Sequence, residues 1–279
     1  MTHPCPVDHF THLVPWSEYA PPFRPAPADI LALQHVIDDL EPRRVVLLGL
    51  TPEIAGCDWP AGVEFTAVDH SAGMIERMWP PPVVPGCARV ACADWCEMPV
   101  PSESVDLVTG DGCLTFLTFD GWRRLAREMA RVLKPGGRFV LRVFLRPDVS
   151  ESVAAIARDL AADRVGDINA LKLRLFGAVH ADGARLHDVW QAWSTMRRGP
   201  GPGYSAISLA QMERYQGSEA RYFLGTDTET SAILGEELFQ ISSASPAGYP
   251  LCERCRTLVF RRYTAGEERP PRAIAAPSR

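Results

Sequence analysis

Residues that could bind a ligand recur where predicted strands end. Gly49 lies near the end of the apolar run "RVVLLGL", Asp69 closes "VEFTAVD", and Asp94 follows "RVACA". Gly110 and Asp111 end a further run, "SVDLVTGD". Open parallel sheets bind ligands beyond the carboxyl ends of their strands, so these positions are expected to converge on one site.

The first two strand ends suit the phosphate or sugar part of a nucleotide. Thr51 is a suitable N-cap, and the free amides of a helix that starts there would attract an anion. A plain strand-to-helix junction explains the lone Gly49 equally well. Asp69 lies twenty residues after Gly49, where an acid accepts the hydroxyls of a ribose, or caps the next helix.

The other two strand ends suit the base and the reacting group. Asp94 could accept a hydrogen bond from an adenine amino group while the Trp95 indole covers the ring; an ordinary turn aspartate is the alternative. Gly110 and Asp111 would face the reacting end of the ligand, which makes Asp111 a candidate catalytic residue. Four successive strand ends that each carry a residue suited to one part of a nucleotide favour a single nucleotide-like ligand.

The elements that must position these residues alternate between strand and helix as far as residue 146. This alternation is typical of a parallel sheet covered on both faces. Helical stretches then interrupt it, and it resumes near residue 228. Predicted strands cover 44–50, 63–69, 88–94, 104–111, 136–145, 238–245 and 256–263, and predicted helices 29–40, 52–57, 71–79, 120–133, 152–165, 168–179, 184–196, 208–216 and 228–237.

This order predicts an α/β fold, a Rossmann-like doubly wound sheet with a helical insertion between its fifth and sixth strands. The expected parts are a proline- and aromatic-rich segment and candidate lid at 1–28, the cofactor-binding core at 29–149, a helical cap at 150–225, the rest of the sheet at 226–264 and a disordered tail at 265–279.

The composition narrows the classes of partner. The 279 residues carry a net charge of −5 and no block of Lys and Arg, so nucleic acid is not expected as a partner. No apolar run is long enough to span a membrane, and "MTHPCPVDHF" lacks the pattern of a signal peptide. We therefore expect a cytoplasmic protein without a membrane partner, either a monomer or a homodimer.

Eight cysteines are scattered along the chain. Without a secretion signal they are expected to be reduced thiols. Only Cys252 and Cys255 have CxxC spacing, and a zinc site needs a second pair, which Cys92 and Cys96 do not supply. No metal site is expected.

Several of these segments together resemble the class I S-adenosylmethionine (SAM)-dependent methyltransferases. The resemblance covers roughly residues 30–146 and is carried by "VVLLGLTPEIA", "VDHSAGMI", "ACADWCEMPVPSESVDLVTGDGCL" and, above all, "ARVLKPGGRFVL". It implies seven strands, with the last antiparallel to its neighbours. It also implies SAM as cofactor, with S-adenosylhomocysteine as its product. The expected cofactor-binding residues are Gly49, Thr51, Glu53, Asp69, His70, Ser71, Met74, Asp94, Trp95, Gly110 and Asp111.

The first turn departs from the pattern of that family, which has an acid followed by glycines at three alternating positions. Here those positions hold Leu47, Gly49, Thr51 and Glu53. The methionyl ammonium of SAM needs an acceptor, and we infer that Glu53 replaces the missing acid from the helix side. A solvated glutamate favoured by the helix dipole is the alternative.

Dinucleotide oxidoreductases share the strand, the turn and the acid at the same spacing. They need close approach of the backbone to a pyrophosphate, which the later glycines permit. A Glu at position 53 would add negative charge beside that pyrophosphate. The zwitterionic cofactor is therefore favoured over NAD.

The insertion lies where a substrate lid would fall, and it holds the candidate acceptor residues. His187, Trp190 and Trp193 are three residues apart and share one helix face, which could hold a flat substrate or pack as core. His180, in a turn, and His187 are both candidate catalytic bases, although lone histidines are commonly structural. Tyr204 is a further candidate in this lid.

The N-terminal segment is the other candidate lid. Trp16, Tyr19 and Arg24 precede the first helix, where related methyltransferases fold a segment over the cofactor; surface docking without function is the alternative. No amine-methylating "NPPY" motif or basic stripe is present, so a small-molecule O-, N- or C-acceptor is expected. A SAM-binding protein without catalysis and a SAM-using enzyme of another reaction type stay open.

Overall fold

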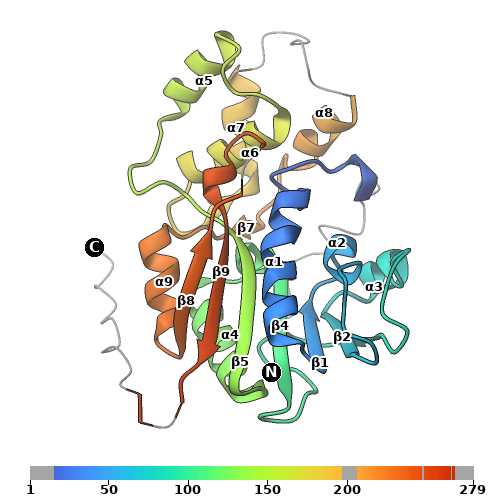
Figure 1. The fold of residues 1–279 in the computed structure, drawn as a ribbon. Helices are drawn as coiled ribbons and strands as arrows, with labels where there is room; N and C mark the ends of the chain where they lie inside the picture. The colour runs from blue at the N-terminus through green and yellow to red at the C-terminus, as the bar shows by residue number, and fades with distance from the viewer. Residues whose placement is uncertain (1–15, 197–205, 247, 265, 268–279) are drawn as a thin grey trace.

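The structure, a computed structural model, describes residues 16–196, 206–246, 248–264 and 266–267, and its centre is one large sheet (Figure 1). The strand order is β3-β2-β1-β4-β5-β9-β8. The strands are β1 (Arg44–Leu48), β2 (Glu64–Asp69), β3 (Arg89–Cys92), β4 (Val105–Asp111), β5 (Leu133–Phe144), β8 (Leu238–Ala244) and β9 (Cys255–Arg262).

The sheet confirms the predicted doubly wound topology. The first five strands are parallel, with Val45 opposite Phe65 on one side and Leu107 on the other. Strand β9 lies antiparallel to both β5 and β8, as the resemblance implied. Because the strand order reverses between β1 and β4, their carboxyl ends open a crevice there.

Both faces of the sheet are covered by helices. Val45 and Leu47 face α1 (Pro27–Leu40) and α2 (Pro52–Ala55), while Val46 and Leu48 face the opposite layer. Strand side chains alternate between the faces, so a strand buried on both sides is apolar throughout. The remaining core helices are α3 (Ala72–Met78), α4 (Phe119–Val132) and α9 (Asp227–Gly235).

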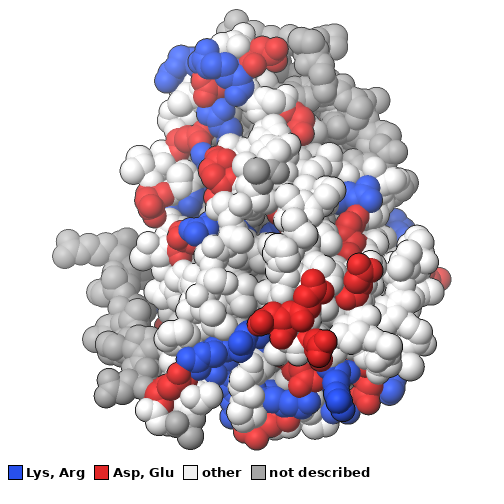
Figure 2. Space-filling model, viewed as in Figure 1, with Lys and Arg blue, Asp and Glu red and all other residues white. Residues whose placement is uncertain are grey.

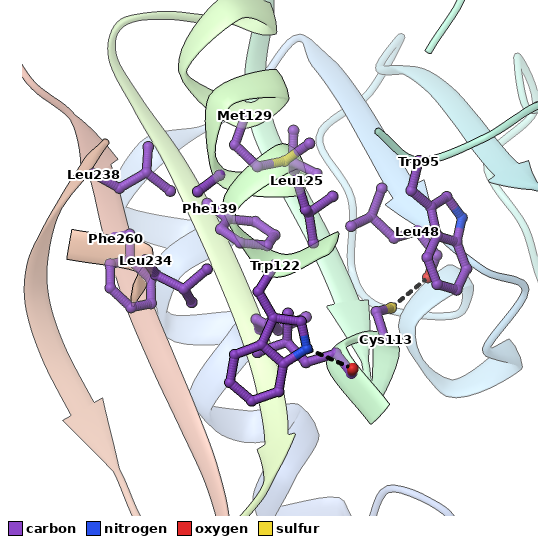
Figure 3. Close-up of a cluster of buried hydrophobic side chains, with 14 of the residues drawn as sticks. Leu48, Trp95, Cys113, Trp122, Leu125, Met129, Phe139, Leu234, Leu238 and Phe260 are labelled. Atoms are coloured by element: carbon purple, nitrogen blue, oxygen red, sulfur yellow. Dashed lines mark hydrogen bonds between the residues drawn. The ribbon is translucent and has the colours of Figure 1, made fainter. Parts of the chain in front are cut away.

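The layer under α4 and α9 is anchored by two side-chain hydrogen bonds near the strand ends (Figure 3). The fully buried Trp122 donates its indole N–H to the carbonyl of Leu114, at 2.7 Å. Cys113 donates its thiol to the carbonyl of Leu48, at 3.4 Å. Both bonds hold the short 3-10 helix Cys113–Phe116, which directly follows β4, against the core.

The helical insertion lies between β5 and β8 in sequence, as predicted, and at the carboxyl end of the parallel strands in space (Figure 1). We call it the cap. It has a hydrophobic core of its own that includes Leu171, Phe176 and Trp193. Its helices are α5 (Val153–Ala161), α6 (Ile168–Ala178), α7 (Leu186–Met196) and α8 (Ala206–Glu213).

Local differences from the sequence prediction have simple causes. Helix α1 begins at Pro27, because Asp29 accepts a hydrogen bond from the Ala26 amide at 2.7 Å, as the third helical residue does in a capping box. The cap contains a two-residue strand pair, β6 (Ala184–Arg185) with β7 (Arg221–Tyr222), that is too short to show a strand pattern. The predicted disordered tail lies mostly outside the described residues.

Candidate active site

A cavity of about 850 Å³ separates the strand ends from the cap. Its floor comes from the turns after β1, β2 and β4, its roof from α6 and α8 of the cap, and one side from the N-terminal residues Trp16, Tyr19 and Phe23. Trp16 and Tyr19 were among the predicted lid residues, and both line the cavity. The volume lies in the range of small-molecule sites.

The turn after β1 forms one end of the floor. Gly49 has a φ of +84°, a left-handed conformation that glycine adopts without strain, and its amide donates to the Val68 carbonyl at 2.8 Å. Thr51 follows at the N-cap position of α2, is buried, and makes no side-chain capping bond. Both residues line the cavity.

Asp69 stands at the end of β2 on the same floor. Its carboxylate accepts the Ser71 amide at 2.8 Å and lies 4.0 Å from Nδ1 of His70. Burial raises the pKa of Asp69, while the Ser71 amide and His70 act in the opposite direction. Ser71 itself caps α3 by accepting from the Met74 amide at 3.2 Å. All four residues line the cavity.

Trp95 closes the floor beside Asp69, whereas its neighbour Asp94 does not take part. The Trp95 indole donates to the Val68 carbonyl at 2.6 Å, and the ring is 6% exposed and meets His70 edge-on. The Asp94 side chain is 54% exposed and pairs with Arg124 at 3.4 Å. Of these two neighbours in sequence, only Trp95 lines the cavity.

The carboxylate of Asp111 is engaged in a buried ion pair. Nε of Arg142 donates to it at 2.6 Å, and Nη1 of Arg142 lies 3.7 Å from Asp29. Burial would lower the pKa of Arg142, but Asp111 and Asp29 raise it; burial also raises the pKa of Asp111, which Arg142 opposes. Asp111 lines the cavity, whereas Gly110 beside it is not among the described residues that do.

Glu53 is held by the N-terminal segment. Its carboxylate accepts from Nε of Arg24 at 2.6 Å and from the indole of Trp16 at 3.0 Å. Neither Glu53 nor Arg24 is among the described residues that line the cavity. The pair connects α2 to the chain that forms one side of the site.

The candidate cap residues lie away from the cavity. His180 accepts the Leu224 amide at 3.2 Å, and His187 accepts the Gly217 amide at 2.9 Å while it stacks on Trp190. Burial lowers the pKa of His180. Trp190 donates to Glu213, and Trp193 is 3% exposed in the cap core. None of the four lines the cavity among the described residues, and Tyr204 lies outside them.

The roof and walls of the cavity consist mostly of residues that the sequence analysis did not select. They line the roof and walls and are mostly aromatic or amide side chains. One of them, Lys172, could have been identified from the sequence. It is a charged residue on the apolar face of α6, four residues from both Ile168 and Phe176. The set is Phe23, Phe116, Phe144, Lys172, Phe176, Gln211, Tyr215 and Tyr222.

The described residues contain no group of three or more His, Cys, Asp or Glu that could hold a metal ion. None of the helices in the described part of the chain has the length and apolar character needed to cross a membrane. The Cys255 thiol is buried, and the described cysteines are free thiols.

Comparisons with known proteins agree with this geometry. Residues 49–141 match a family described as a methyltransferase domain. A SAM-dependent methyltransferase structure from Methanosarcina mazei is 14% identical over 86% of this chain and 98% of that one, with a TM-score of 0.50. A protein from Rhodobacter sphaeroides, provisionally described as a Zn-dependent alcohol dehydrogenase, is 15% identical over 86% and 91%, with a TM-score of 0.55. No curated protein sequence matches the chain.

At these identities the two structures show the Rossmann-like fold. The family match covers the turns after β1, β2 and β4 that form the cavity floor. Residues 49–141 therefore carry a methyltransferase domain. This match supports methyl transfer as the activity and SAM as the cofactor.

Proposed function

We propose that this enzyme methylates a small organic molecule bound between the strand ends and the cap. The observation that carries the proposal is that one continuous cavity is shared by the cofactor-binding floor and an aromatic roof. A site enclosed in this way fits an acceptor of small-molecule size. On the face shown in Figure 2, Lys and Arg stand among Asp and Glu and form no continuous basic surface.

The floor offers the groups that SAM requires. The Asp69 carboxylate would accept the ribose hydroxyls, and the Trp95 and Met74 side chains would contact the adenine. The turn at Gly49 and Thr51 would hold the methionyl end. When bound, SAM supplies an electrophilic methyl group on a sulfonium.

The walls offer an apolar slot for the acceptor. Phe23 packs edge-on against Phe144 at 5.3 Å and against Phe176 at 5.9 Å. Tyr222 packs edge-on against Phe116 at 5.5 Å. Such rings bury flat apolar molecules well and exclude water. Because methyl transfer is an in-line displacement, holding the acceptor in a fixed orientation accounts for much of the catalysis.

Two measurements test this proposal. Calorimetry should show that the purified chain binds SAM. Incubation with SAM and a panel of hydroxy- and amino-substituted small molecules should then yield methylated product by mass spectrometry. Binding without any methylated product would favour a non-catalytic SAM-binding protein, and consumption of SAM with another product would favour a different reaction type.

A further inference from the structure

The chain contains only two lysines, Lys134 and Lys172, beside its arginines and seven histidines. Arginine does not lose its proton in proteins, whereas a buried lysine can. Lys134 forms a 2.6 Å salt bridge with Asp106 and is 41% exposed. Lys172 is the lysine in the wall of the cavity, and it is 2% exposed.

Lys172 is buried without a compensating charge. Its Nζ hydrogen-bonds to Oε1 of Gln211, which extends from α8 on the other side of the roof and is itself 6% exposed. No carboxylate in the described part of the chain forms a salt bridge with it. A lone buried ammonium is costly, so such a site favours the neutral amine. Burial lowers the pKa of Lys172 to about 7, an effect that Asp167 partly opposes.

An aromatic wall connects Lys172 with the cofactor side. Phe116 lies in the 3-10 helix that follows β4 and packs against Tyr222, and Tyr222 packs against Phe176 at 5.2 Å. Phe176 lies one helical turn after Lys172 on the same face of α6. A flat ring in this slot would have its polar substituent close to the amine.

We propose that Lys172 is the catalytic base of the enzyme and that the acceptor carries a hydroxyl group on an aromatic ring. This inference rests on the proposed function, because it concerns the acceptor half of the same cavity. Gln211 is a positioning residue. Its Oε1 accepts a hydrogen bond from one N–H of the amine, so that the lone pair of Nζ is directed at the hydroxyl of the acceptor.

The methyl transfer needs no reactant besides the acceptor, SAM and Lys172. The neutral Lys172 amine takes the proton of the hydroxyl, and the acceptor oxygen forms a bond to the methyl carbon. The carbon–sulfur bond breaks and its electron pair stays on sulfur, which gives the thioether product. Lys172 is left as an ammonium and releases the proton to water before the next turnover.

The charged and titratable groups around Lys172 are carboxylate, phenol and guanidinium groups, while His70 lies at the cavity floor beside Asp69. Asp167 is a carboxylate at the start of α6, occupied by the amides of Asn169 and Ala170. Tyr19, Tyr215 and Tyr222 line the same cavity, and burial raises the pKa of all three. Arg214 and Arg221 lie at the exposed rim.

The proton exchange can be observed directly, because Lys134→Arg leaves a single lysine in the chain. Isotope labelling of lysine then gives one set of side-chain NMR signals, whose pH titration reports Lys172 in the absence of an acceptor. We expect the signals to titrate near neutral pH. An ammonium that persists to about pH 9, close to ordinary lysine behaviour, would overturn the proposal.

Turnover is the second readout, measured with the phenol from the acceptor panel that the enzyme methylates. Lys172→Met keeps the buried volume apolar, and it should lower kcat by about 10²–10⁴-fold while the Kd of SAM stays unchanged. Lys172→Arg keeps a positive charge but cannot act as a base, so it should not rescue turnover. The kcat of the wild type should fall at acid pH with the ionisation that NMR assigns to Lys172.

Wild-type turnover in either Lys172→Met or Lys172→Arg would overturn the proposal. If Lys172→Arg alone kept wild-type turnover, Lys172 would be an anchor for an anionic acceptor. Methylation of acceptors that lack a ring hydroxyl, with none of phenols, would also overturn it. These outcomes differ from failure of the proposed function, in which the wild type binds no SAM or methylates no small molecule.

Discussion

Asp69 is the residue on which the cofactor placement depends most. Its carboxylate is almost buried at the cavity floor and already accepts the Ser71 amide, so its second oxygen is oriented by the turn. We expect Asp69→Ala to weaken SAM binding by about 2–3 kcal/mol, the scale of charge-assisted hydrogen bonds lost from a desolvated site. Calorimetry measures this directly.

The matched control is Asp94→Ala, which removes an exposed carboxylate at the next strand end. Its side chain does not line the cavity, so affinity should not change. Equal weakening by both substitutions, or none by Asp69→Ala in a folded protein, would contradict the placement of the ribose.

Asp111 is a different case, because its carboxylate compensates Arg142. Removing one member of a buried ion pair leaves the other charge unpaired, which commonly costs about 3–5 kcal/mol. We therefore expect Asp111→Asn to lower the free energy of unfolding substantially, as measured with denaturant. In the double variant Asp111→Leu with Arg142→Leu, Asp29 loses Arg142 but keeps its bonds to the Ala26 amide and the Tyr249 hydroxyl, so the loss should be smaller; a larger loss would contradict this account.

At the scale of elements, the N-terminal segment is attached to α2 through Glu53. The carboxylate is 17% exposed and bonded to both Arg24 and Trp16. If Glu53 holds this segment over the cavity, Glu53→Gln should weaken SAM, S-adenosylhomocysteine and methylthioadenosine by similar factors. The sequence-based hypothesis, in which Glu53 binds the ammonium of SAM, predicts weakening of the first two only. Calorimetry with the three ligands decides between them.

The control for this experiment is Arg24→Met, which removes the other partner of the same contact. It should reproduce the effect of Glu53→Gln if the segment is what matters. If Arg24→Met leaves the affinities unchanged while Glu53→Gln weakens only SAM and S-adenosylhomocysteine, Glu53 binds the ammonium of SAM, as the sequence-based hypothesis states.

At the scale of the whole molecule, burial of Lys172 makes stability depend on pH. The folded protein binds fewer protons at this group than the unfolded chain between about pH 7 and the ordinary lysine range near 10.4, so this contribution to stability rises with pH in that window. Buried thiols such as Cys57, whose pKa burial raises to about 12, act in the opposite direction. The difference between wild type and Lys172→Met isolates the lysine.

Lys172→Met should therefore be more stable than the wild type at pH 7. Its advantage should shrink steadily up to about pH 9.5, because over this range the folded wild type has released the lysine proton that its unfolded chain still holds. Chemical denaturation at both pH values measures this. An advantage that stays constant or grows with pH would show that Lys172 keeps its charge in the folded protein.

The order of strands and helices in the core could be predicted from the sequence, because it depends on local patterns. Apolar runs such as residues 44–50 are buried on both faces, and a Gly or an Asp stands at the carboxyl ends of β1, β2 and β4, at the same edge of the sheet. Strand ends in a parallel sheet must meet, so Gly49, Asp69 and Trp95 could be placed on one cavity floor before any coordinates. The family resemblance of the same segments supplied the antiparallel last strand.

Only the tertiary structure decided which side chains reach the cavity. The rotation of a cap helix depends on contacts with segments far away in sequence, and α7 turns Trp193 into the cap core while α6 turns Lys172 toward the site. His180 and His187 are each occupied by a backbone amide from a distant loop. Glu53 likewise found its partners in Arg24 and Trp16, because long-range packing, rather than the type of residue, determines which polar groups stay available for a ligand.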